Sequence, residues 1–303
     1  MMINSKKKLI VICGPTAVGK TSFSIALAQK LQSEILSADS RQFYRELKIG
    51  TAPPSELELK LVPHHFIGHL SIQDTYNVSM YEKEANNKIN TIFNHTNNIV
   101  VVGGSGLYIN ALINGIDDLP DPDDSTRSYL KSIFQNEGIE SLRKLLKKLD
   151  PEYYLIVDLH NHKRLMRALE VCITSGKTYS SLRKNIFKER NYQTIWVGLE
   201  RPRNELFDII NSRTDLMINH GLVEEAHKLI SFKHLNALNT VGYKELFEYL
   251  ENKTSLNKAI ENIKTNTRRY AKRQLTWFKR IPEINWFNTE NKNEIIEFIL
   301  SIN

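Results

Sequence analysis

Residues 14–21, with the sequence GPTAVGKT, have the types and spacing of a phosphate-binding loop. They match the pattern G-x-x-x-x-G-K-[ST] and lie between an apolar run and a helical pattern, as this motif requires. The glycines let backbone N–H groups approach phosphate oxygens, the lysine reaches the terminal phosphate, and the last hydroxyl can hold Mg²⁺. The predicted diphosphate- or nucleotide-binding residues are Gly14, Pro15, Thr16, Ala17, Val18, Gly19, Lys20 and Thr21, with Thr21 as the metal ligand.

This loop alone does not identify a reaction. Phosphoryl transfer and release of a diphosphate leaving group both place negative charge on the same phosphate oxygens, so either reaction can use it. The loop predicts a binder of diphosphates or triphosphates, and weak binding of ATP stays open.

Asp39 is a further candidate for a chemical role. It follows a short apolar run at residues 34–38, and ligands of parallel sheets bind beyond the carboxyl ends of the strands. Its carboxylate should therefore face the phosphate-binding loop and could act as a base. Aspartate is also common in turns and helix caps, so position alone leaves both interpretations open. Ser40, Arg41 and Gln42 add polar groups able to bind base edges or a ribose-phosphate backbone.

The positive charge is concentrated in one part of the chain. Lys and Arg number 41 against 34 Asp and Glu, a net charge of +7, and residues 264–282 alone contain seven basic residues and no acidic one. Such a stripe favours a polyanionic partner, although a solvated helix face has the same composition. Lys163, Arg164 and Arg167 form a second basic cluster on a helix that Asn161 can cap; by itself this cluster is more typical of a solvated face.

Hydrophobic patterning predicts an α/β fold, a P-loop NTPase-like parallel sheet flanked by helices, with an all-helical insertion. The predicted catalytic core comprises residues 1–118 and 193–303, and the insertion comprises residues 119–192, beginning at the turn-rich segment LPDPDD. Strands are predicted over 8–13, 34–38, 98–102 and 194–199, and helices over 20–32, 203–219, 222–230, 242–250 and 256–278.

Several classes of protein and site are disfavoured. Cys13 and Cys172 lie far apart in apolar surroundings, which argues against disulfides and a Cys-rich zinc site. His64 and His65 have no third metal ligand nearby, so we expect a structural role for them. The polar, basic N-terminus lacks the apolar stretch of a signal peptide, and no apolar run is long enough to span a membrane. We expect a cytoplasmic protein with no membrane partner.

A set of longer motifs resembles the tRNA dimethylallyltransferase family, of the bacterial type without a C-terminal zinc finger. The motifs run in colinear order over nearly the whole chain: GPTAVGKT, SADSRQFY, IGTAPP, HHFI, GGSGLY, KRLMRALEV, RTDLMINHGLVEEA, VGYKEL and TRRYAKRQLTWF. The resemblance implies a transferase that moves a dimethylallyl group from dimethylallyl diphosphate to N6 of the adenosine 3′ of the anticodon, releasing diphosphate. It implies tRNA, through its anticodon stem-loop, and dimethylallyl diphosphate as partners, and Mg²⁺ as cofactor. We expect the protein to act as a monomer.

The resemblance also implies roles for individual residues. Asp39 matches the general base, and Arg213 and Lys20 match groups that neutralise the diphosphate. The positions that match tRNA-contacting residues are Asp39, Ser40, Arg41, Gln42, Ser105, Arg127, Lys163, Arg164, Leu165, Met166 and Arg167.

The chain departs from the family pattern at two places. Residues 51–54 read TAPP where members often read TAKP, and Lys163-Arg164 stands where members often have Gln-Arg. Two other functions stay open on the residues alone. A small-molecule kinase would explain the phosphate-binding loop but not the basic segments. A non-catalytic RNA-binding protein would explain the charge but leaves Asp39 without a task.

Overall fold

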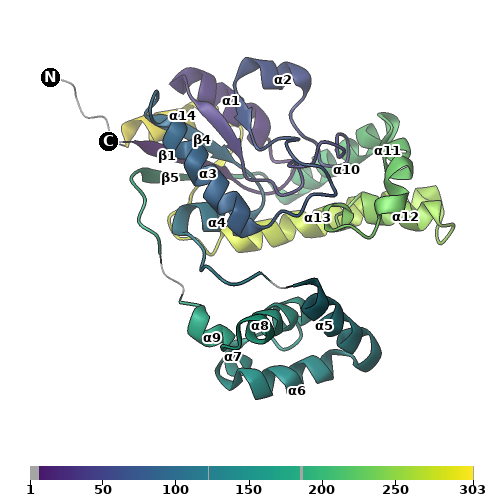
Figure 1. Ribbon diagram of the computed structural model, residues 1–303. Helices are drawn as coiled ribbons and strands as arrows, with labels where there is room; N and C mark the ends of the chain where they lie inside the picture. The colour runs from purple at the N-terminus through teal and green to yellow at the C-terminus, as the bar shows by residue number, and fades with distance from the viewer. Residues whose placement is uncertain (1–6, 122, 185–186, 303) are drawn as a thin grey trace. The chain divides into compact units, whose positions relative to one another are not determined.

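A computed structural model describes residues 7–121, 123–184 and 187–302, and Figure 1 shows the helices and strands of each unit. The chain divides into two compact units, residues 1–113 with 189–303, and residues 114–188. The first unit contains a six-stranded sheet of order β3-β2-β4-β1-β5-β6, and every paired strand is parallel. The strands are β1 (Lys8–Cys13), β2 (Glu34–Ser37), β3 (His64–His65), β4 (Asn98–Val102), β5 (Gln193–Glu200) and β6 (Asn285–Asn288).

Both faces of this sheet are buried, which explains why its central strands are continuous apolar runs. Along β1, Leu9 and Val11 belong to one hydrophobic core, and Ile10 and Ile12 belong to the other. Side chains alternate between the faces of a strand, so one apolar run serves both cores. The core that contains Ile10 includes residues of α1 (Lys20–Leu31), α10 (Arg203–Asn219) and α14 (Lys292–Ser301).

The core on the opposite face includes residues from five longer helices. They are α3 (Val78–Ile92), α4 (Gly106–Asn114), α11 (Leu222–Leu229), α12 (Tyr243–Leu250) and α13 (Leu256–Phe278). The short elements α2 (Glu56–Leu61), η1 (Ile230–Phe232) and η2 (Asn236–Leu238) lie in the connections. The longest of these helices is α13. It places residues from late in the chain beside the loops that follow β1 and β4.

The regular secondary structure of the second unit is all helical within its described residues. It consists of α5 (Asp124–Glu137), α6 (Ile139–Leu149), α7 (Pro151–Ile156), α8 (His162–Ser175) and α9 (Tyr179–Leu182). Leu130, Leu142, Leu146, Leu165 and Leu169 are fully buried in its own hydrophobic core. Side chains at the N-caps of α5, α7, α8 and α9 accept backbone N–H bonds, including Asn161 at the start of α8, the cap expected from the sequence. The unit is bounded at residues 114 and 188, whereas the sequence pattern placed the insertion at 119–192.

The predicted fold class, a parallel α/β sheet flanked by helices with an additional helical region, is confirmed. Strands β1, β4 and β5 and helices α1, α10, α11, α12 and α13 lie where they were predicted, within a residue or two at their ends. Strand β2 ends at Ser37 rather than at Ala38, although the Ala38 N–H still bonds to the Val102 carbonyl. Within the described part of the chain, no helix is both long and apolar enough to cross a membrane.

Candidate active site

The phosphate-binding loop connects β1 to α1 and has a backbone that its glycines make possible. Gly14 has φ of 140°, and a Cβ there would lie 2.5 Å from the Leu199 carbonyl oxygen in β5. Gly19 has φ of 104° at the N-cap of α1. Both values lie in the region that favours glycine, so side chains at these positions would strain the loop. The loop therefore delivers Lys20 and Thr21 at the positive end of the α1 dipole.

The Lys20 side chain folds back over its own loop. Its ammonium donates to the carbonyl oxygens of Gly14 at 3.1 Å and Pro15 at 2.7 Å. Burial lowers the pKa of Lys20 to about 8, with the Asp39 carboxylate acting in the opposite direction. A desolvated ammonium with two neutral partners is well placed to exchange them for a phosphate oxygen, because an anion would compensate the cost of burial.

Asp39 lies where the two hollows of this edge of the sheet meet. Its carboxylate lines a cavity of about 470 Å³ and also a small pocket of about 30 Å³ that contains Lys20 and Thr21. One carboxylate oxygen accepts the Arg41 N–H at 3.0 Å, which fixes the side chain at the strand end. The sequence-predicted neighbours, the loop and the strand-end acid, are therefore brought together.

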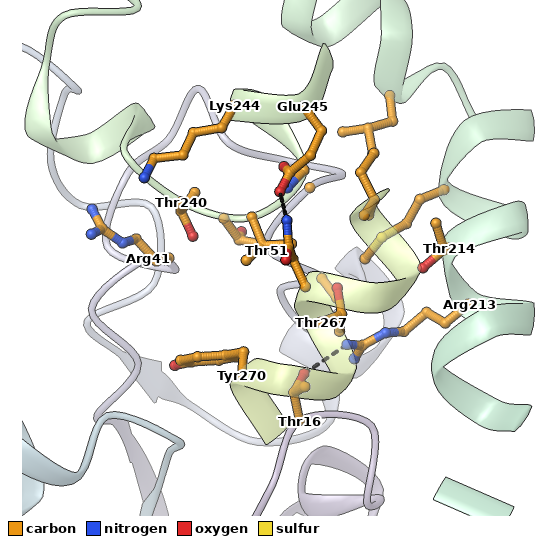
Figure 2. A pocket seen from close by; sticks show the side chains of 18 of the residues that line it. Thr16, Arg41, Thr51, Arg213, Thr214, Thr240, Lys244, Glu245, Thr267 and Tyr270 are labelled. Atoms are coloured by element: carbon orange, nitrogen blue, oxygen red, sulfur yellow. Dashed lines mark hydrogen bonds between the residues drawn. The ribbon is translucent and has the colours of Figure 1, made fainter. Parts of the chain in front are cut away.

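Arg213 reaches the same cavity from α10. Its guanidinium donates to the Thr16 hydroxyl at 2.6 Å, and Figure 2 shows the two side chains meeting at the cavity wall. Burial lowers the pKa of Arg213, and the Asp39 carboxylate opposes that shift. The Asp39 carboxylate and the buried Arg213 guanidinium thus share the cavity wall, with the Lys20 ammonium in the adjoining small pocket.

Other polar groups of the cavity come from segments that the sequence did not assign to the site. Arg273 lines it from α13. Figure 2 shows Thr267 and Tyr270 of the same helix, and Lys244 and Glu245 of α12, around the cavity. Burial raises the pKa of Tyr270, as does the nearby Asp39 carboxylate, so its phenol stays neutral. The VGYKEL and TRRYAKRQLTWF motifs were the signals for these residues, but only the packing of α12 and α13 on the sheet places them here.

A third segment of wall, around Gly50, is held by a carboxylate. Glu225 of α11 accepts the backbone N–H groups of Ile49 and Gly50 and, at 2.6 Å, the hydroxyl of Tyr243. A Cβ on Gly50 would lie 2.7 Å from the Tyr243 ring, so this close approach needs glycine. The arrangement fixes the loop from which Thr51 and Ala52 line the cavity.

The residues after Asp39 have diverse surroundings. Ser40 and Arg41 line the cavity, and Arg41 donates to the carbonyls of residues 236, 237 and 239. Gln42 turns inward instead, and its amide donates to the Thr51 and Ala52 carbonyls. Ser105 accepts the Ser40 N–H at 3.0 Å, so its hydroxyl supports the segment that starts at Asp39.

The remaining residues that match tRNA-contacting positions belong to the helical unit. Arg127 and Arg167 both contact the carboxylate of Glu170, at 3.2 and 3.6 Å. Lys163 and Arg164 are exposed at the start of α8. Met166 is half-buried, and the Leu165 side chain is fully buried in the core of the unit, which gives Leu165 a packing role.

Among the residues that the structure describes, no cluster of side chains could bind a metal ion by itself. They contain no group of three or more His, Cys, Asp or Glu side chains able to hold an ion. Thr21 nevertheless lines the small pocket with Asp39, and Mg²⁺ in phosphate sites is commonly held by few protein ligands together with substrate phosphates and water. The site therefore fits a magnesium ion that arrives with its phosphates.

The two histidines, His64 and His65, have different surroundings, and His64 also lines the small pocket that contains Lys20. His65 and His95 each contact one oxygen of the Glu34 carboxylate, at 2.5 and 2.8 Å. The ring of His64 contacts the Val62 carbonyl at 2.8 Å.

Comparison with known proteins gives consistent results over nearly the whole chain. Residues 42–281 match the IPP transferase family. The tRNA dimethylallyltransferase of Christiangramia forsetii is 52% identical, over 97% of each chain. A solved structure of the full-length tRNA isopentenylpyrophosphate transferase from Bacillus halodurans is 36% identical, with a TM-score of 0.71 and coverage of 97% of this chain and 96% of that one. A eukaryotic dimethylallyltransferase solved while acting on tRNA is 27% identical, with a TM-score of 0.79, over 97% of this chain and 80% of that one.

Proposed function

This chain belongs to the IPP transferase family, the tRNA dimethylallyltransferases, and from that premise we propose how its own residues move a dimethylallyl group from dimethylallyl diphosphate to tRNA. The enzyme is a prenyltransferase. One observation carries the assignment of roles: the Asp39 carboxylate lines both the small pocket that contains Lys20 and the larger cavity that Arg213 enters. A base and two cations at the junction of two hollows match a reaction between a diphosphate and an amine.

The donor diphosphate occupies the loop of residues 14–21. The loop N–H groups and the N-terminus of α1 bind its oxygens, and Lys20 exchanges its two carbonyl partners for phosphate. Arg213, held against Thr16, stabilises the charge that develops on the leaving group. Arg213 is already oriented by Thr16 before the reaction, so little reorganisation of this cation accompanies the departure of diphosphate.

The acceptor amine enters the larger cavity and meets Asp39. The nitrogen lone pair of N6 forms a bond to the allylic carbon while the bond from that carbon to the diphosphate oxygen breaks. Asp39 takes one N6 proton, and diphosphate leaves with the bonding electron pair. The adenine has to leave its stack to reach the cavity, which costs little in a single-stranded anticodon loop.

Magnesium fits this scheme as a partner of the donor. Thr21 would hold it beside the loop, where the ion supplies additional positive charge for the diphosphate. Asp39 then remains available for the amine.

RNA recognition is divided between the two units. Ser40 and Arg41 lie beside Asp39, with Ser105 as their support, and suit the nucleotides next to the reacting adenosine. In the helical unit, Lys163 and Arg164 are exposed and suit phosphates of the anticodon stem, and Arg127 and Arg167 lie on the same unit beside Glu170. All proposed groups come from one chain, so a monomer suffices. Because tRNA is the substrate, the proposed site of action is the cytoplasm.

The direct test is mass spectrometry of tRNA nucleosides after incubation with dimethylallyl diphosphate and Mg²⁺. We expect N6-(dimethylallyl)adenosine, formed only with both substrates, and stoichiometric diphosphate. Transfer of label from the γ-phosphate of ATP to a metabolite, with unmodified tRNA, would instead support a kinase. Bound but unmodified tRNA at saturating donor would support a non-catalytic RNA-binding protein.

A further inference from the structure

Gln274 is a buried polar side chain that joins two loops of the active site. It lies on α13 with only 5% of its surface exposed. Its carbonyl oxygen accepts the Thr16 N–H at 2.8 Å, and its amide nitrogen donates to the Gly104 carbonyl at 2.9 Å. Both loops follow neighbouring parallel strands, β1 and β4. One amide therefore satisfies one group on each loop and sets the spacing between them.

The packing around this amide leaves no room for another side chain. A Cβ on Gly104 would lie 2.2 Å from the Gln274 amide nitrogen, and a Cβ on Gly106 would lie 2.2 Å from the Trp277 ring. Neither glycine has a positive φ, so space rather than backbone conformation requires them. The GGSG segment, residues 103–106, thus packs closely against α13. This close packing lets Gln274 of α13 reach the phosphate-binding loop.

Thr16 connects Gln274 to the cations of the site. Its N–H is held by Gln274, and its hydroxyl accepts the bond from Arg213 at 2.6 Å. The position of the Arg213 guanidinium therefore depends on a backbone segment that α13 holds. Gly104, which accepts the other end of the amide, lies near Lys20, since a Cβ on Gly104 would be 3.9 Å from the Lys20 ammonium.

We infer that Gln274 is a positioning residue for the donor cradle: it holds Thr16, and through it Arg213, at the distance from the GGSG segment at which the diphosphate is bound and displaced. This inference rests on the proposed binding of the donor diphosphate by residues 14–21. Gln274 itself does not contact the reacting atoms. Replacing it should change kcat/KM for the donor and not the affinity for tRNA.

Two substitutions separate the halves of the amide. Gln274→Met keeps length and volume but removes both hydrogen bonds. Gln274→Glu keeps an oxygen for the Thr16 N–H but loses the donor to the Gly104 carbonyl. A purely structural residue would lower the melting temperature and leave the kinetic constants alone when each variant is assayed well below its own transition. Ile299→Ala, in the core on the α1 side of the sheet, is the control for loss of stability alone.

We expect Gln274→Met to lower kcat/KM for dimethylallyl diphosphate by roughly 10- to 100-fold, because small misplacements of reacting groups have effects of this size. The dissociation constant for tRNA should stay close to that of the wild-type protein. Gln274→Glu should recover part of the loss, and Ile299→Ala should leave the donor constants unchanged. Unchanged donor constants in both Gln274 variants, or an equal loss in Ile299→Ala, would overturn the inference. If Gln274→Met does not fold, Gln274→Glu alone decides between these outcomes.

Binding of inorganic diphosphate, measured by calorimetry, distinguishes failure of this inference from failure of the proposed function. Wild-type protein that binds diphosphate only weakly, and no less after Lys20→Ala, would show that the proposed site itself is wrong. Wild-type protein that binds diphosphate through Lys20, and Gln274→Met that binds it equally well and reacts equally fast, would overturn the role of Gln274 alone.

Discussion

The buried cations beside Asp39 in the core and the exposed cations of the helical unit use positive charge in opposite ways. In the core, burial lowers the pKa values of Lys20 and Arg213, and both lie beside the Asp39 carboxylate. In the helical unit, Lys163 and Arg164 are exposed at the start of α8. A buried cation is costly unless an anion of fixed position compensates it, whereas an exposed cation attracts phosphate at long range and is screened by salt. The buried cations of the core are therefore suited to chemistry on one diphosphate, and the exposed cations of the helical unit are suited to adjustable contact with a long polyanion.

Not every basic residue of the helical unit belongs to that second class. Arg127 and Arg167 share the Glu170 carboxylate, which is buried in the unit. Removing either arginine would disturb this buried carboxylate as well as any RNA contact. Lys163 and Arg164 are consequently the better residues with which to test RNA binding alone.

The largest effect expected from this comparison is at Asp39. Asp39→Asn preserves the size of the side chain but removes the base, so kcat should fall roughly 10²- to 10⁴-fold. The affinity for tRNA should stay within a few-fold of the wild-type value, measured by filter binding or fluorescence anisotropy. Near-normal turnover of this variant would contradict the assignment of the general base.

Lys20→Ala should have the next largest effect, confined to the donor. Loss of one preorganised cation at the leaving group is expected to lower kcat/KM for dimethylallyl diphosphate by on the order of 10² or more. Binding of tRNA in the absence of donor should be little changed. Equal losses in donor use and tRNA binding would mean that the loop mainly supports folding or RNA contact.

The dependence of rate on pH tests the same cation without removing it. Lys20 is protonated below its pKa of about 8 in the free protein and neutral above it. We therefore expect kcat/KM for the donor to fall as pH rises through 8, by about tenfold per pH unit on the steep limb. Bound diphosphate raises this pKa, so kcat should fall only at higher pH. Lys20→Arg stays charged over this range, so its kcat/KM should no longer fall above pH 8. If the fall is unchanged in that variant, another group causes it.

The sequence could predict the residues whose position depends on local structure. Residues 14–21 form their loop because a glycine pattern, a strand and a helix lie next to each other along the chain. Asp39 could be placed because all strands of a parallel sheet end at one edge. The pattern of Tyr81, Ala85, Ile89 and Ile92 also carried a helical signal for α3, which the dense Asn and Lys residues between them obscured.

The rest of the site depends on contacts between distant parts of the chain. Tyr270 and Gln274 lie within a strongly basic stretch, and charge draws attention to the exposed side of that helix. Only the docking of α13 on Gly104 and Gly106 turns its other side towards Thr16. Strand β3 has two residues, too few for any periodicity, and β6 is a short run with the sequence NWFN. Pairing with β2 and β5 defines these strands, and no local pattern does.

The smallest expected effect on chemistry, and the sharpest test of the division between the units, is in the helical unit. Replacing both Lys163 and Arg164 by Gln removes two exposed cations and leaves Glu170 with its arginines. For every phosphate that is no longer neutralised, the slope of log affinity against log salt concentration should decrease by roughly 0.7 to 0.9. We expect weaker tRNA binding and a flatter salt dependence, with kcat at saturating tRNA close to wild type because Asp39 and Lys20 are untouched.

Arg167→Gln, added as a third change, sharpens this test. If Arg167 only balances the charge of Glu170, the substitution Arg167→Gln should lower the melting temperature of the protein and leave the salt slope of the double variant unchanged. If it also binds a phosphate, the slope should decrease by about one further step of the same size. An unchanged slope together with a collapse of saturated turnover would contradict the comparison itself, since the helical unit would then contribute to the reaction and not to the grip on tRNA.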